Sequence, residues 1–281
     1  MRTLGLVALV VAVLVATTVA SPWVASVTGR AFSFGRVYDR VFEGLLLLGL
    51  VVTWRPLDLG TPRELGFRGS DAGRWLVRGL AAGGAGLAVG LVAGWLGGGV
   101  VPAIRFSAAK TLRKAALGFV AAIAIGAGEE VLFRGVLLRR FGRDGGRTFA
   151  VVTTAASYAA VHLLRARTEQ GSATLAAGVV RTVGLFAPLA VPTAWPALAG
   201  LFALGVVLAV ARLRSGTLWF PIGMHAAWVA VFRVGRLFFD VRPRPAWLVG
   251  PGWPPLVGGA AGAAALAATA CLVLRATAPR S

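Results

Sequence analysis

The stretch IGAGEEVLFRG (125–135) places three ionisable side chains inside a strongly apolar region of the chain. Glu129 and Glu130 are adjacent, and Arg134 follows four residues after the second glutamate. A charged side chain within an apolar membrane helix costs about 2.5–3.5 kcal/mol on insertion scales, so such groups are rare and usually functional. The stretch therefore predicts a functional site within this run.

Helix geometry separates the roles of the three side chains. Glu130 and Arg134 lie one turn apart on one face, where they can form an ion pair. Glu129 points about 100° away from Glu130 around the helix axis and faces Phe133, so we do not expect it to pair with Arg134. A carboxylate in an apolar setting without a tight cationic partner suits a general base. The spacing equally allows one structural ion cluster of all three.

The two histidines of the chain lie in separate apolar runs. His162 belongs to TTAASYAAVHLL (153–164) and His225 to LWFPIGMHAAWVAVF (218–232). Together with Glu129 they make either a His-His-Glu zinc set or a base with hydrogen-bond donors around a carbonyl group. Both arrangements suit hydrolysis of an amide bond. The sequence has no His-Glu-x-x-His motif, and it leaves zinc open.

The composition of the chain indicates which kind of structural element positions these glutamate, arginine and histidine side chains. Of the 281 residues, 57% are hydrophobic and 14% are charged, whereas soluble domains carry roughly 25% charged residues. An all-α, polytopic transmembrane bundle of about eight spans is predicted, since a span needs about 20 apolar residues. The candidate runs are residues 4–20, 41–54, 75–102, 115–138, 149–164, 173–192, 196–211, 218–239 and 256–274.

The net charge of +19 would suggest nucleic acid in a soluble protein. Here the arginines gather in short connections such as RFGRDGGR (140–147) and FRVGRLFFDVRPRP (232–245). We therefore expect contact with an anionic bilayer surface and no nucleic-acid partner. The richness in Ala, Gly, Val and Arg favours a bacterial inner membrane. APLAVPTAWP (187–196), without a basic residue, is the candidate extracytoplasmic turn.

The chain is expected to divide into N-terminal helices and basic loops (1–114), a catalytic membrane core (115–240) and a C-terminal helix (241–281). The first apolar run resembles a signal peptide, but an uncleaved first helix is the prediction. The polar stretch 55–74 is expected to be a loop or a short surface helix. The lone Cys271 matches no disulfide or metal-cysteine pattern.

Four motifs in order resemble one known family. They are EEVLFR (129–134), YAAVH (158–162), FALG (202–205) and RLRSGTLWFPIGMHAAWV (212–229). Over about residues 115–232 the chain resembles the CPBP family, the CAAX protease and bacteriocin-processing group of intramembrane proteases. The resemblance implies a helical membrane enzyme that cuts a membrane-anchored protein or peptide near its C-terminus.

The resemblance also implies a role for each motif residue. Glu129 would activate water together with His162, and His225 would help to hold the oxyanion. Glu130 and Arg134 would form a supporting ion pair. The family is regarded as glutamate-type, and no cofactor is certain. Zinc, if present, would take Glu129, His162 and His225.

Two positions depart from the family pattern. Tyr158 replaces a phenylalanine, and Val229 stands where the family has Asn or Asp. Valine donates no hydrogen bond, and loss of a comparable oxyanion donor costs roughly 2.7–4 kcal/mol. By helix spacing, the hydroxyl of Tyr158 or the indole N–H of Trp228 is a candidate replacement.

Two other function classes share some of these residue features. Val229 supports a catalytically silent scaffold or immunity protein. The retained Glu129, His162 and His225 count against this function. Buried Glu and His side chains also build proton relays in transporters. No matched pair of Gly/Pro-broken segments marks an inverted repeat, which disfavours a transporter. For a protease, the candidate substrates are a prenylated tail, a bacteriocin-like peptide or the C-terminal sorting helix of a surface protein.

Overall fold

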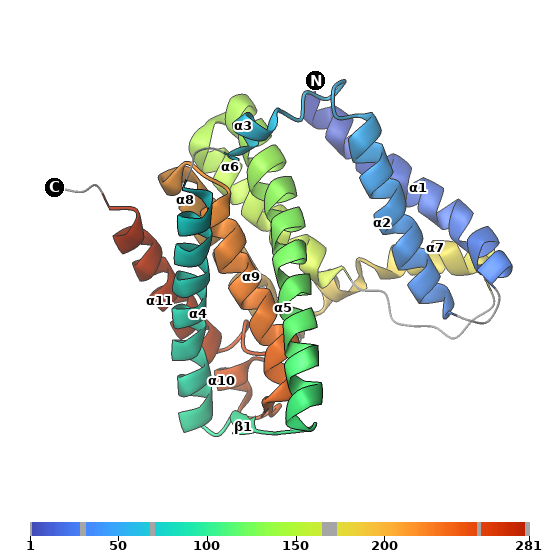
Figure 1. Cartoon of the computed structure of the whole chain (residues 1–281). Coiled ribbons are helices and arrows are strands. Elements are labelled where there is room, and N and C mark those ends of the chain that lie inside the picture. The colour runs from blue at the N-terminus through green and yellow to red at the C-terminus, as the bar shows by residue number, and fades with distance from the viewer. Residues whose placement is uncertain (1, 29–31, 68–70, 165–172, 252–253, 279–281) are drawn as a thin grey trace. The chain divides into compact units, whose positions relative to one another are not determined.

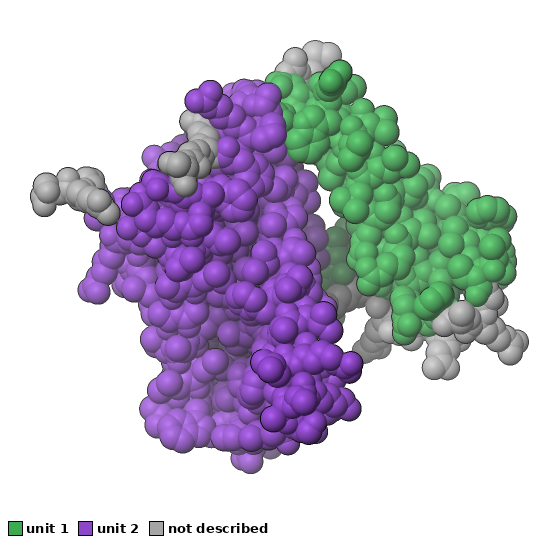
Figure 2. Space-filling view, in the orientation of Figure 1, with its two compact units in different colours: residues 1–60, 162–192 green, residues 61–161, 193–281 purple. Residues whose placement is uncertain are grey.

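The computed structural model describes residues 2–28, 32–67, 71–164, 173–251 and 254–278. Two compact units emerge from it: residues 1–60 with 162–192, and residues 61–161 with 193–281 (Figure 2). Almost every described element is a helix, and several helices are long and apolar (Figure 1). The predicted all-α membrane bundle is confirmed.

The smaller unit is built from α1 (Arg2–Thr28), α2 (Phe34–Val52) and α7 (Leu175–Gly184). Hydroxyl groups join the three helices. The Oγ1 atom of Thr182 lies 2.6 Å from the Thr18 hydroxyl and 2.6 Å from the Tyr38 hydroxyl. Each hydroxyl has one hydrogen, so Tyr38 can donate to Thr182, Thr182 to Thr18, and Thr18 to the carbonyl of Leu14, which satisfies all three within an apolar unit.

The larger unit surrounds α9 (Trp219–Val234), which Figure 1 shows between α4 (Ala72–Leu96) and α5 (Ala108–Glu130). Two further helices, α8 (Trp195–Ser215) and α11 (Ala260–Ala276), complete its layers. A Cβ on Gly79 would lie 2.1 Å from the carbonyl oxygen of Phe220. The glycine-rich face of α4 therefore lets the α9 backbone approach closely, as small residues do in membrane helices.

A continuous apolar helical stretch runs from Ala108 to Leu163. Its 56 residues would extend about 84 Å as one straight helix, against about 30 Å of hydrocarbon core. Gly146, with φ of 80°, breaks it within α6 (Leu138–Leu163). The break falls between the predicted apolar runs 115–138 and 149–164, so the stretch comprises two arms.

Four helical stretches of the described chain are long and apolar enough to cross a membrane. They are Thr3–Thr28, Ala72–Leu96, Ala108–Leu163 and Pro192–Ser215, and shorter apolar helices cover Leu175–Ala190 and Ala260–Ala276. The protein is therefore an integral membrane protein. The count of about eight spans stays a prediction.

Two apolar runs end earlier than predicted. The helices stop at Leu96 and Val234, although the apolar runs continue to Pro102 and Phe239. Instead, β1 (Val100–Pro102) pairs antiparallel with β2 (Phe239–Val241). Three consecutive glycines (97–99), with φ of 72° at Gly98, end α4 and turn the chain into β1. The short elements η5 (Gly235–Leu237) and α10 (Ala246–Val249) lie on either side of β2 in the sequence.

The polar stretch 55–74 contains one short helix, α3 (Pro62–Leu65), within its described part. Thr61 and Glu64 form a capping box, and the Thr61 backbone N–H donates to Glu64 Oε2 at 2.7 Å. This hydrogen bond lowers the pKa of Glu64 below its usual value. The ionised carboxylate pairs with Arg139 of α6 at 2.9 Å and so ties α3 to α6.

Candidate active site

The site is built around a buried ion pair at the junction of α5 and the π-helical segment η2 (Val131–Leu137). Arg134 Nη1 donates to Glu130 Oε1 at 2.8 Å, and both side chains are 0% exposed. Arg134 Nη2 donates to the carbonyl of Gly205 in α8 at 3.1 Å. The guanidinium also lies 4.6 Å from the ring centre of Tyr158 in α6. Three helical segments therefore converge on one arginine.

His225 lies buried in the middle of α9 and extends this network. Its Nδ1 atom lies 2.8 Å from Glu130 Oε1, and its Nε2 atom lies 3.2 Å from the Tyr158 hydroxyl. An ionised carboxylate only accepts, so Nδ1 is assigned as the donor to Glu130. In the neutral ring Nε2 then accepts from Tyr158. Glu130 thus fixes the tautomer and the orientation of His225.

Glu129 differs from its neighbour in exposure. Its side chain is 31% exposed, and its Oε2 atom lies 3.7 Å from Nε2 of His225. The structure therefore joins Glu129, Glu130, Arg134 and His225 in one cluster, with Glu129 at the accessible edge. The Glu129 side chain is therefore partly open to solvent, although its Oε2 atom is buried, whereas Glu130 is fully enclosed.

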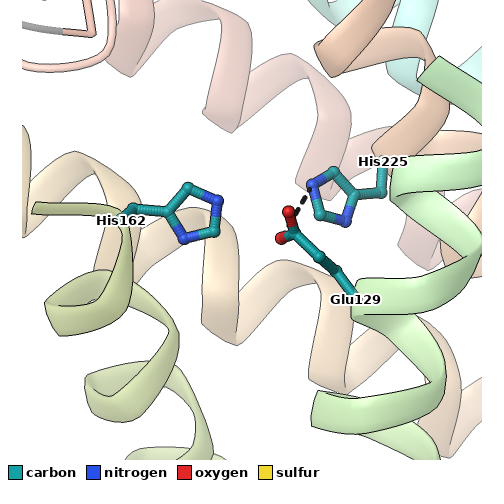
Figure 3. Close-up of side chains that lie close together, drawn as sticks. All are labelled: Glu129, His162 and His225. Atoms are coloured by element: carbon teal, nitrogen blue, oxygen red, sulfur yellow. Dashed lines mark ion pairs between the residues drawn. The ribbon is translucent and has the colours of Figure 1, made fainter. Parts of the chain in front are cut away.

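His162 occupies the last turn of α6, one turn after Tyr158. The boundary between the two units falls after Val161, but α6 continues as a helix to Leu163. The nearest ligand atoms of Glu129, His162 and His225 lie within 4.8 Å of one another. Figure 3 shows the two imidazoles on opposite sides of the Glu129 carboxylate. Segments from three parts of the sequence thus meet in one constellation.

Comparison with protein-family models finds a match over residues 111–231 to "Type II CAAX prenyl endopeptidase Rce1-like". Residues 111–231 of this chain thus form a CAAX protease-type domain. The match covers all five charged or histidine side chains of the cluster, whereas residues 1–110 and 232–281 lie outside it. Comparisons with curated proteins and with solved structures gave no match. The match supports a CAAX-type intramembrane endopeptidase at the level of the family.

Three side chains of the Rce1-like domain are of the types that commonly bind zinc. Glu129 would offer a carboxylate oxygen, and His162 and His225 one imidazole nitrogen each. The contact of His225 Nδ1 with Glu130 is the outer-shell arrangement common to zinc-bound histidines. A bound zinc ion would polarise a carbonyl group and make its bound water more acidic.

Several features of the Rce1-like site were not predicted from the sequence. The FALG motif did not identify the Gly205 carbonyl as a partner of Arg134. The π-helical turn at η2 follows Glu130 directly, and such turns recur at functional sites. The indole Nε1 of Trp228 is buried and makes no hydrogen bond within the described residues. Val229 is half-buried and offers no donor.

Replacing Gly205 by valine should destabilise the domain by about 1–3 kcal/mol, the usual cost of overpacking. A Cβ at this position would lie 2.9 Å from Cα of Ala155 in α6, so α8 must move and withdraw the carbonyl from Arg134. Thermal unfolding in detergent measures the effect. Gly84→Val is the matched control, because a Cβ on Gly84 of α4 meets nothing within 4 Å. Equal melting temperatures for the two variants would contradict this packing role.

Proposed function

We propose that the protein is an intramembrane endopeptidase that hydrolyses a peptide bond near the C-terminus of a membrane-anchored protein or peptide. One observation carries the proposal: Glu129, 31% exposed, lies beside a histidine that the buried Glu130–Arg134 pair orients. A carboxylate next to a positioned imidazole, on a side chain partly open to solvent, is an arrangement that suits hydrolysis of an amide.

In the proposed reaction, Glu129 takes a proton from a water molecule that His162 helps to position. The water oxygen bonds to the carbonyl carbon of the substrate, and the carbonyl oxygen becomes an oxyanion. The C–N bond then breaks, and Glu129 returns the proton to the departing amine. Negative charge thus moves from Glu129 to the substrate oxygen and back, and the protein ends in its starting state.

His225 and Tyr158 are the proposed partners of the oxyanion. Tyr158 has an O–H group 3.2 Å from His225 Nε2, in a fully buried position. When the oxyanion forms, this hydroxyl can turn from Nε2 to the substrate oxygen. A protonated His225 can donate from Nε2 in the same way, while its Nδ1 stays held by Glu130. Tyr158 would therefore supply the hydrogen bond that Val229 lacks.

Removing the two candidate replacements for the donor that Val229 lacks, the Tyr158 hydroxyl and the Trp228 indole N–H, should slow cleavage strongly. Tyr158→Phe combined with Trp228→Phe is expected to lower kcat by about 10²-fold or more, because each lost oxyanion donor has an effect of that order. The rate of product formation from a membrane-anchored peptide in proteoliposomes measures it. Full activity in the double variant would remove both residues from the proposed role.

The substrate classes can be separated with membrane-anchored reporters. Purified protein in proteoliposomes is given a prenylated C-terminal peptide, a leader-bearing bacteriocin-like peptide or a C-terminal sorting helix, and products are identified by mass spectrometry. The matched family model carries "CAAX prenyl endopeptidase" in its description, which supports testing the prenylated peptide first. We propose a bacterial inner membrane as the location, which disfavours prenylated tails as the natural substrate.

The metal content of the purified protein distinguishes a zinc-dependent mechanism from a metal-free, glutamate-type one. Elemental analysis of the purified protein, read together with sensitivity to chelators, shows whether zinc accompanies Glu129, His162 and His225. One zinc per chain that is lost in His162→Ala would assign the metal to this site. Full activity without metal would leave Glu129 as the base of a glutamate-type enzyme.

A catalytically silent scaffold or immunity protein is the second candidate function. Val229 favours it, because this position in α9 donates no hydrogen bond. A silent protein would keep its cellular effect when Glu129 is replaced by glutamine, whereas a protease would lose it.

A further inference from the structure

A cavity lies in the larger unit, at the C-terminal end of α9. It has a volume of about 470 Å³ and opens between α9, β2 and the segment that precedes α11. Val231, on its wall, follows His225 by six residues, which is about 9 Å along the helix axis. None of the proposed catalytic side chains lines it. The cavity is therefore a site separate from the proposed catalytic cluster.

The walls of this cavity combine two chemistries. Val231, Phe232 and Leu256 offer apolar surface, while Arg236 and Arg242 line the same space. Asp240 also lines it, but its carboxylate pairs with Arg105. Within the described residues, neither guanidinium group of Arg236 and Arg242 makes a hydrogen bond or an ion pair. The cavity thus presents two available cations beside an apolar wall.

The neighbouring surface has the character of a membrane–water interface. Two tryptophans are exposed on helices that pack, through Ala93 and Val249, in one apolar cluster with Leu256 of the cavity wall. They are Trp95, in the last turn of α4, at 57% and Trp247, in α10, at 71%. Tryptophans gather at the depth of lipid headgroups, where basic side chains meet anionic lipid. A ligand with an anionic head and an apolar tail would match both the cavity walls and this setting.

We propose that this cavity binds an anionic phospholipid. Its phosphate lies between Arg236 and Arg242, and the upper part of one acyl chain lies along Val231, Phe232 and Leu256. A free phosphate ion shares the chemistry of the head but would leave the apolar wall without a partner. The lipid would fix the depth of α9, and with it that of His225, in the bilayer.

Native mass spectrometry of the full-length protein tests the proposal. Micelles contain either phosphatidylglycerol or phosphatidylcholine with the same acyl chains. Wild-type protein should retain phosphatidylglycerol in preference, and Arg236→Gln/Arg242→Gln should lower that retention about tenfold or more. The matched control is Arg74→Gln/Arg275→Gln, which also removes two positive charges. Arg74 lies in the first turn of α4 and Arg275 in the last turn of α11, and neither lines the cavity. Its retention should equal that of the wild type.

A second variant separates the cavity from general surface charge. Val231→Trp fills the cavity and keeps both arginines, so it should lose phosphatidylglycerol as well. Inorganic phosphate at millimolar concentration should not displace the lipid from the wild type, and displacement would identify a simple anion site instead. Equal retention by the arginine double variant and its control, or equal retention of the two lipids, would overturn the proposal.

Discussion

Replacing Glu129 by glutamine is expected to abolish cleavage of a membrane-anchored substrate while leaving the fold intact. Loss of a general base lowers rates by about 10²–10⁴-fold, and glutamine cannot take a proton from water. The fold should persist, because the Glu129 side chain is 31% exposed and the buried pair uses Glu130 instead. The measurement is the cleavage rate in proteoliposomes, together with the melting temperature of the same preparation.

Glu43→Gln is the matched control for Glu129→Gln. Glu43 is an exposed carboxylate of α2 that pairs with Arg40 at 2.5 Å. Its replacement removes one negative charge and should leave the cleavage rate unchanged. A Glu129→Gln protein that cleaves as fast as this control would exclude Glu129 as the base.

Replacing Arg134 by leucine should have the largest effect on stability. Removing one partner of a buried ion pair leaves an uncompensated charge and costs about 3–5 kcal/mol. Here Glu130 would remain at 0% exposure, and among the described residues only His225 Nδ1 would lie within hydrogen-bonding distance of Oε1. The hydrogen bond from Arg134 to the Gly205 carbonyl would be lost at the same time. Thermal unfolding in detergent should show a strongly lowered melting temperature or loss of the folded protein.

The double variant Glu130→Leu/Arg134→Leu distinguishes a stranded charge from lost packing. With both charges removed, much of the stability lost in Arg134→Leu should return, since apolar replacement of a buried pair is often neutral or better. Activity should stay low, because His225 Nδ1 would no longer be held by a carboxylate. An Arg134→Leu protein as stable as the wild type would contradict the buried-pair account.

Local geometry was the part of the site that the sequence could predict. The spacing of Glu130 and Arg134 places them on one helix face, and the structure has them 2.8 Å apart. Apolar runs likewise located the helices, since burial in lipid imposes a long uninterrupted hydrophobic segment. Even the break between the two arms of Ala108–Leu163 follows from the local cluster RFGRDGGR around Gly146.

Contacts between distant segments could not be predicted in the same way. Glu130 and His225 are separated by 95 residues and Arg134 and Gly205 by 71, so no periodicity connects them. The β1–β2 pair escaped notice because three-residue strands give almost no alternation and their residues continue apolar runs. The cavity beside Arg236 and Arg242 depends on that pairing. Neither the strands nor the cavity produces a local sequence pattern from which it could be predicted.

The most direct test of the account compares membranes of the native host that contain either the wild-type protein or Glu129→Gln at equal abundance. Protein termini and uncut precursors are quantified by mass spectrometry. The account predicts that at least one membrane-anchored precursor accumulates in the variant only, with its new C-terminus present in the wild type alone. Identical termini in both membranes, with the cellular effect of the protein retained in the variant, would contradict proteolysis and favour the silent scaffold.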